Sequence, residues 1–160
     1  MPVTDTGQGG GSKRSIELDM ISIDEFLPAG LAVDLVKIDV EGHEPFVMRG
    51  MQKTIRRSPN IRIFIEFVEA FLSQTVSAHQ FAAEIEAMGL RICRLMSRSE
   101  LELIERGQTP RGASYCLLTR TPEEDIAHAK RAGKHLPARM ARYIRRLEAA
   151  WDRYRRALYR

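Results

Sequence analysis

Residues 33–44 read VDLVKIDVEGHE, and this stretch decides the fold prediction. Its first eight residues form a short, β-branched and nearly continuous apolar run, which predicts an interior strand covered on both faces. Gly42 then permits a sharp turn, and Pro45 suits the first turn of a following helix. The sequence therefore predicts a strand over residues 33–40 and a helix that continues until the SPN breaker at residues 58–60. The apolar stripe of this helix is expected at Phe46, Val47, Met51 and Ile55.

Further strands and helices are predicted on both sides of this stretch. Downstream, IRIFIEFV at residues 61–68 is a second strand, and a capping box at residues 77–80 opens a helix that ends at Gly89. Residues 90–96 and 115–118 are two more strands, and the long loop between them suggests an antiparallel pair at one edge. Upstream, residues 16–20 alternate like a half-buried strand, and the box SIDE opens a short helix. This order predicts an α/β fold with a parallel sheet and helices on both faces.

Composition narrows the classes of protein to consider. The chain has 160 residues, of which 44% are hydrophobic and 29% charged, which indicates one globular domain. No apolar run reaches the ~20 residues of a membrane span, and the first residues have no apolar region typical of a secretory signal. Cys93 and Cys116 are expected to be free thiols, consistent with a cytoplasmic location. The polar, glycine-rich residues 1–14 are expected to be a flexible lead-in.

Acidic residues and a histidine lie at the ends of the two strands predicted at residues 33–40 and 61–68. Asp39, Glu41, His43 and Glu44 end the first strand, and Glu66 and then Glu69 end the second. Because ligands bind outside the carboxyl ends of strands in open α/β sheets, we expect these groups to converge at a site. Glu41 and Glu66 could hold a divalent cation, and His43 is a candidate general base. Simpler explanations remain open: Asp39 and Glu41 could cap the next helix, His43 could be a solvated loop residue, and Lys37 could form a structural ion pair with Asp39.

Three segments of the chain closely resemble one enzyme family. They are VDLVKIDVEGHEPFVMRGM with IRIFIEF after it and ELDMISIDEFL before it, and together they resemble the FkbM-type methyltransferases that use S-adenosylmethionine. The resemblance covers residues 15–121 and implies a Rossmann-like sheet of order 3-2-1-4-5-7-6, in which KIDV is the fourth strand and IRIFIEF the fifth. It implies methyl transfer to a hydroxyl of a small molecule or sugar, with Asp39 and Glu41 beside the methyl group and the acceptor. The catalytic candidates are then Asp39, Glu41, His43 and Glu66, and Asp39 is also the cofactor-binding candidate.

The chain departs from that family in one respect. The family holds the cofactor with a glycine-rich turn after its first strand and an acidic residue at the end of its second, and only fourteen residues precede Ser15. We therefore expect a truncated domain with strands 4-5-7-6, an orphan strand 3 at residues 16–20 and an exposed apolar edge at residues 35–40. We expect it to be inactive alone, with a missing N-terminal half that another chain could supply.

Residues 122–160 form a basic tail outside the resemblance. They hold 11 basic and 5 acidic residues, net +6, which leaves the rest of the chain at net −2. From residue 140 the apolar positions recur at spacings of four and three, which predicts an amphipathic helix; they are Met140, Ile144, Leu147, Trp151, Tyr154 and Leu158. This stripe could pack on its own domain, join two copies in a homo-oligomer, or leave the arginines to bind an anionic partner. Nucleic acid is not expected because no nucleic-acid motif is present. The alternative function is therefore a non-catalytic interaction module.

Overall fold

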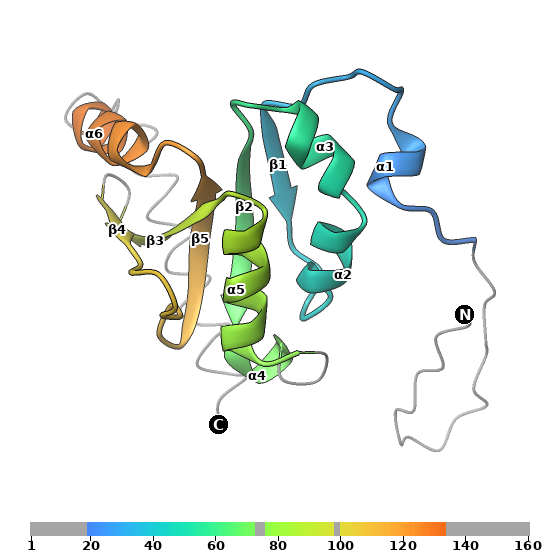
Figure 1. Ribbon diagram of the computed structural model, residues 1–160. Helices are drawn as coiled ribbons and strands as arrows, with labels where there is room; N and C mark the ends of the chain where they lie inside the picture. The colour runs from blue at the N-terminus through green and yellow to red at the C-terminus, as the bar shows by residue number, and fades with distance from the viewer. Residues whose placement is uncertain (1–18, 73–75, 98–99, 134–160) are drawn as a thin grey trace, which may run out of the picture.

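The computed structural model describes residues 19–72, 76–97 and 100–133, which form a mixed α/β fold around an open five-stranded sheet (Figure 1). This confirms the predicted α/β class. Along the chain the elements are α1 (Ile23–Phe26), β1 (Leu35–Ile38), α2 (Glu44–Arg49), α3 (Gln52–Arg57), β2 (Arg62–Val68), α4 (Glu69–Leu72), α5 (Ala78–Ala87), β3 (Arg91–Ser97), β4 (Glu100–Leu103), β5 (Ala113–Thr119) and α6 (Pro122–Gly133).

The strands lie in the order β1-β2-β5-β3-β4. Only β1 and β2 are parallel, because the helices α2 and α3 carry the chain back between them; β5 is antiparallel to both β2 and β3. The sheet is therefore mixed and not parallel. The predicted antiparallel pairing of the last two strong strands is confirmed, but the pair lies inside the sheet and not at its edge, because β4 forms that edge. The sequence prediction missed β4, a four-residue strand that pairs with β3 inside the charged connection.

Strand β1 differs from its prediction as an interior strand. It lies at the edge of the described sheet, and Leu35 is 63% exposed, so it is not covered on both faces. The position of β1 at an edge does agree with the other expectation from the sequence, which was an exposed apolar edge at residues 35–40. The half-buried strand predicted at residues 16–20 is not seen in its described part, because residues 19–20 are not in a strand and Met20 is 82% exposed. Residues 16–18 lie outside the described ranges, as do the lead-in 1–14 and the stripe 140–158.

The single helix predicted after Gly42 is two short helices. Helix α2 ends at Arg49 and α3 starts at Gln52, because Asp24 of α1 accepts hydrogen bonds from the backbone N–H groups of Lys53 (2.8 Å) and Thr54 (2.7 Å) and so caps a new helix start. The buried stripe shifts with this break. Phe46 is 51% exposed, whereas Met48 and Met51 are fully buried.

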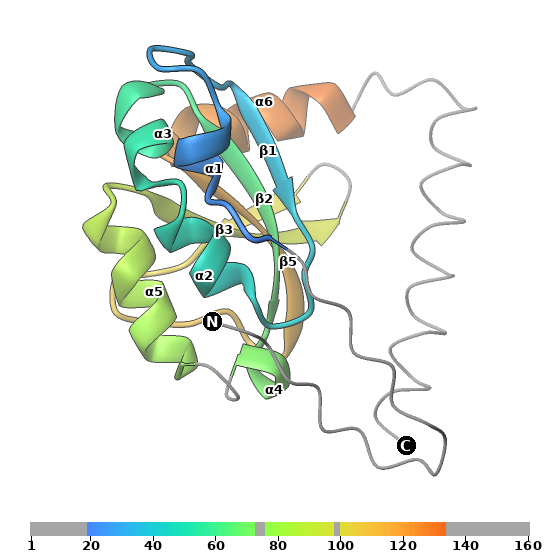
Figure 2. The same cartoon turned by 90° about the vertical axis from the view of Figure 1, so that its right-hand side faces the viewer.

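The main core lies between one face of the sheet and the layer formed by α1, α2, α3 and α5 (Figure 2). Its largest contributors from the strands are Ile63, Ile65 and Phe67, which alternate along β2, and Phe81 of α5 stacks on Phe67. A smaller cluster on the opposite face joins α6 to β3, β4 and β5 through Cys93, Leu101 and Leu117. Cys93 and Cys116 are both free and buried, as predicted for free thiols.

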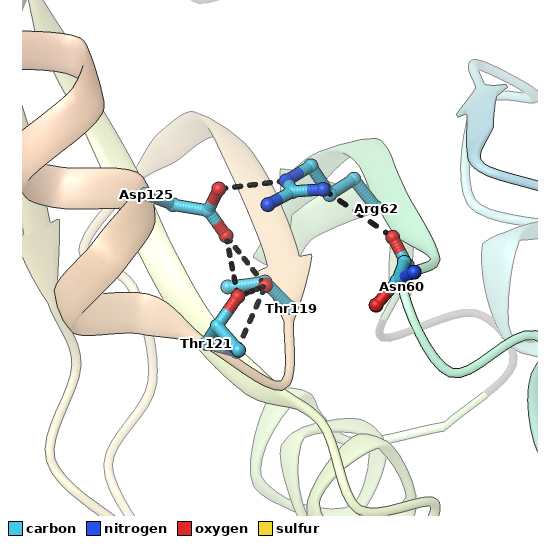
Figure 3. A network of polar contacts seen from close by, with 5 residues as sticks. All are labelled: Asn60, Arg62, Thr119, Thr121 and Asp125. Carbon is cyan, nitrogen blue, oxygen red and sulfur yellow. Dashed lines mark hydrogen bonds and ion pairs between the residues drawn. The ribbon is translucent and has the colours of Figure 1, made fainter.

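A polar network fixes the start of α6 to the sheet (Figure 3). The Asp125 carboxylate accepts from Arg62 Nε of β2 (2.6 Å) through one oxygen and from the Thr119 hydroxyl of β5 (2.6 Å) through the other. Thr121 completes the network, since its N–H donates to Thr119 Oγ1 (3.1 Å). The basic tail predicted at 122–160 thus begins with a helix that is attached to the domain.

Replacing Asp125 by Ala is expected to lower the free energy of unfolding by about 2–4 kcal/mol, because a buried threonine hydroxyl and an arginine lose their acceptor. Glu124→Ala is the matched control, since Glu124 lies in the same helical turn but is exposed. Urea denaturation of the two variants measures the difference. Equal stabilities would show that the network does not hold α6.

Candidate active site

The chain turns sharply between β1 and α2 at residues 40–43. His43 N–H donates to the Val40 carbonyl (3.3 Å), and both central residues have positive φ, 48° at Glu41 and 97° at Gly42. These angles are those of a type I′ turn. Glu41 is the only non-glycine residue with positive φ in the described ranges, and such backbone strain concentrates at functional sites.

Glu44 holds this turn in place from inside. Its two carboxylate oxygens accept hydrogen bonds from the backbone N–H groups of Val40 (3.1 Å) and Gly42 (2.9 Å), and the residue is only 2% exposed. The capping of α2 that the sequence left open for Asp39 or Glu41 is not seen, because this helix has no side-chain capping bond at its N-cap; Glu44 instead stabilises the turn that precedes the helix. Asp39 and Glu41 keep their carboxylates outside the turn.

Glu66 is the buried member of the acidic group. It lies near the carboxyl end of β2, is 5% exposed, and its Oε1 has no hydrogen-bond partner among the described residues. Burial raises the pKa of Glu66 to about 7, and the negative charges of Asp39, Glu44 and Glu41 add to the rise. These carboxylates are therefore near one another, as the sequence predicts, and Glu66 changes its charge near neutral pH.

Tyr115 is a site residue that the sequence did not indicate. It lies directly opposite Glu66 in the antiparallel pair of β2 and β5. Burial, followed by the charges of Glu66 and Asp39, raises the pKa of Tyr115 to about 12, so the phenol keeps its proton. The only signal in the sequence was its place in a strand, because the register between β2 and β5 cannot be read from either strand alone.

The other predicted site residues are exposed, and among them Asp39 and Glu41 form an acidic rim whose charges act on Glu66, whereas neither His43 nor Glu69 is shown to lie beside it. Asp39 pairs with Lys37 at 2.6 Å, and the exposure of both side chains limits the stability this ion pair provides. His43 occupies the N-cap position of α2 without a side-chain capping bond, and its ring lies 5.9 Å from that of Phe46. Glu69 is exposed at the start of α4. The side chains of Asp39, Glu41 and His43 are thus accessible to a ligand.

The metal site predicted at Glu41 and Glu66 finds no support. In the part of the chain that the structure describes, no group of three or more His, Cys, Asp or Glu side chains is placed to hold a metal ion. Asp39, Glu41 and Glu44 lie near Glu66, but Glu44 directs both of its oxygens to backbone N–H groups and so offers none to a metal. We assign no metal to the site.

A pocket of about 380 Å³ lies elsewhere, among α2, α3 and α5. Its polar lining includes Arg49 and Glu84, which pair with each other at 2.6 Å. None of the acidic residues described above lines it. The chemistry therefore favours the strand ends as the candidate active site.

Within the described ranges, no helix has the length and apolar character needed to cross a bilayer.

Comparison with known proteins identifies the family of the chain. The family model described as the methyltransferase FkbM domain matches residues 3–98, more than half of the chain, and the match covers part of that domain. It includes the type I′ turn, Glu44 and Glu66. The search of curated proteins and the search of solved structures gave no match. From the family match, supported by the acidic turn that the structure shows, we conclude that the chain belongs to the FkbM methyltransferase domain family.

Proposed function

We propose that this chain forms the acceptor side of a methyltransferase that uses S-adenosylmethionine to methylate a hydroxyl of a small molecule or sugar. The observation that carries the proposal is Glu66: a buried carboxylate near three others, with a pKa of about 7 and one oxygen that has no hydrogen-bond partner in the described part of the chain. A group that titrates near neutral pH is suited to accept a proton in catalysis.

The topology supports the same proposal. Strands β1, β2, β5 and β3 lie side by side in that order, which is the order 4-5-7-6 implied by the resemblance. In this assignment the acidic turn follows the fourth strand and Glu66 belongs to the fifth. Both lie near the carboxyl ends of neighbouring parallel strands, where open α/β sheets bind their ligands.

The charge of the site fits this cofactor. When bound, S-adenosylmethionine supplies a methyl group that is electrophilic because it is attached to a positively charged sulfur. Asp39, Glu41, Glu44 and Glu66 give this corner a negative field that favours a cation, and Asp39 is the exposed carboxylate that would contact the cofactor. Glu66, once ionised, accepts the proton of the acceptor hydroxyl, while Glu41 on the rim and the exposed His43 at the start of α2 orient the acceptor.

Cofactor binding and acceptor binding are assigned to different parts of the enzyme in this proposal. The glycine-rich turn and the acidic ribose contact that the resemblance implies are not found among the described residues. We propose that residues outside these 160, in the same or another polypeptide, provide them. These 160 residues by themselves are then expected to bind the cofactor weakly and not to transfer a methyl group. Titration calorimetry checks this part, and one-to-one micromolar binding of S-adenosylmethionine would contradict it.

The proposed role of Glu66 in catalysis is tested on protein expressed from the gene together with its natural flanking sequence. The assay follows transfer of an isotopically labelled methyl group to a panel of sugars and small hydroxyl compounds. Glu66→Gln is expected to lower turnover by about 10²–10⁴-fold, the usual contribution of a general base. Glu69→Gln, the exposed neighbour three residues on, is the control and is expected to retain activity. Activity of the wild type should rise with pH through about 7. Full activity of Glu66→Gln would refute the role of Glu66, and absence of transfer in the wild type would favour the interaction module.

A further inference from the structure

The second face of the sheet, opposite α2 and α5, is covered over only part of its area by the described residues. Helix α6 packs Ile126 and Ala129 over the β3–β4 side of this face. On the β1–β2 side the register places Leu35 and Phe64 on the same face, and they are 63% and 36% exposed. Leu95 of β3, 39% exposed, extends this apolar surface. We call Leu35, Phe64 and Leu95 the open face.

Apolar side chains in the middle of a sheet are unusual without a covering layer, because sheets pack at least one further layer on each apolar face. Phe64 is such a residue, since it belongs to β2, which has a strand on either side, and it is still partly exposed. We therefore expect a further segment or partner to cover the open face.

We propose that the occupant is the chain's own segment 140–158, which lies outside the described residues, docked through its apolar stripe. The described chain ends in α6, which lies on this side of the sheet (Figure 2). Residues 134–139 can span at most about 20 Å, enough for the chain to turn back over the face. As a helix, residues 140–158 would be about 28 Å long. The seven-residue strand β2 is about 23 Å long, so the two lengths match.

Charge favours the same occupant. Asp39, Glu41 and Glu66 place negative charge next to the open face. The basic residues on this face are Lys37, opposite Phe64, and Arg62, opposite Leu35, and each is paired with a carboxylate, Asp39 and Asp125 respectively. The segment 140–158 holds six arginines and two acidic residues. Opposite charges at the rim of an apolar contact set its register and direction. A helix from a second copy would have the same charges, but it would lack the short tether that raises the local concentration of the chain's own segment.

Trp151 lies in the stripe and is the only tryptophan of the chain, so its fluorescence reports docking directly. In the full chain we expect blue-shifted emission, weak acrylamide quenching that is independent of protein concentration, and a monomeric mass by sedimentation. Phe64→Asp is expected to shift emission to the red and to raise the quenching constant to that of a free peptide of residues 138–160. Phe26→Asp is the control, because Phe26 is 72% exposed on α1 in the opposite layer, and it is expected to leave both signals unchanged.

Leu35→Lys provides a second variant that keeps the central strand intact, since Leu35 lies on the edge strand. It places a positive charge against the arginine-rich segment and is expected to weaken docking as Phe64→Asp does. Exposed tryptophan in the wild type would overturn the proposal. So would burial that grows with concentration together with a dimeric mass, which would assign the stripe to a second copy. The measurement involves no cofactor or methyl transfer, so its outcome is independent of the proposed function.

Discussion

Glu66→Gln is expected to raise the free energy of unfolding at pH 8 by about 3 kcal/mol while it removes the proposed general base. The carboxyl group of an unfolded chain titrates near its usual pKa of 4.5, whereas burial and the neighbouring carboxylates raise the pKa of Glu66 in the folded protein to about 7. Between these two values the folded state keeps a proton that the unfolded state has lost, so stability falls as pH rises. Above about pH 7 the whole loss is present. Glutamine has a similar shape and never ionises, so the variant escapes this loss.

The sign of the pH dependence makes the test specific. The stability difference between Glu66→Gln and the wild type should be small at pH 4.5, grow between pH 4.5 and 7, and stay constant above that range. Urea unfolding at four pH values measures it, with Glu69→Gln as the control that shows no such growth. A wild type whose stability does not fall relative to the variant over this range would mean that Glu66 is ionised in the folded protein at pH 5. The proton-acceptor proposal would then lose its electrostatic basis.

The elements that the sequence predicted well are those defined by local chemistry. The capping box at Ser22 and Glu25 is present with both of its hydrogen bonds, and Ser77 caps α5 through the Gln80 N–H (3.1 Å). Strand β2 was predicted because most of the residues in the run 61–68 are β-branched or aromatic, and such residues favour extended structure and burial. These signals depend on a few adjacent residues, so a single sequence is enough to read them.

The errors arise where distant residues decide the outcome. The break between α2 and α3 depends on Asp24, which lies almost thirty residues earlier and caps α3 from another helix. Strand β1 has the composition of an interior strand, but its burial depends on what pairs with it. The acidic site shows the same division: the strand ends predicted the convergence, whereas the roles of Glu44 and Tyr115 follow from the turn geometry and from the register of β2 with β5.

Gly42→Ala is expected to destabilise the chain by about 3–5 kcal/mol, near the upper end for a single substitution. Two independent effects add. Gly42 has φ of 97°, where an L-residue is strained by roughly 1–2 kcal/mol. A Cβ at this position would also lie 2.8 Å from the backbone carbonyl oxygen of Phe71 in α4, so either the turn or α4 must move. Urea denaturation measures the loss.

Gly30→Ala separates the two effects. Gly30 has a similar φ of 85°, but a Cβ there would meet no heavy atom within 4 Å, so this variant is expected to lose only the conformational part, about 1 kcal/mol. If the two variants lose equal stability, the contact between the turn and α4 does not constrain the site. If Gly42→Ala loses several times more, the turn is held against α4, and Glu41 keeps its strained backbone because Glu44 inside the turn and Phe71 behind it leave no room to relax. The position of the acidic rim relative to Glu66 would then be fixed before any ligand binds, which is the preorganisation that the proposed methyl transfer requires.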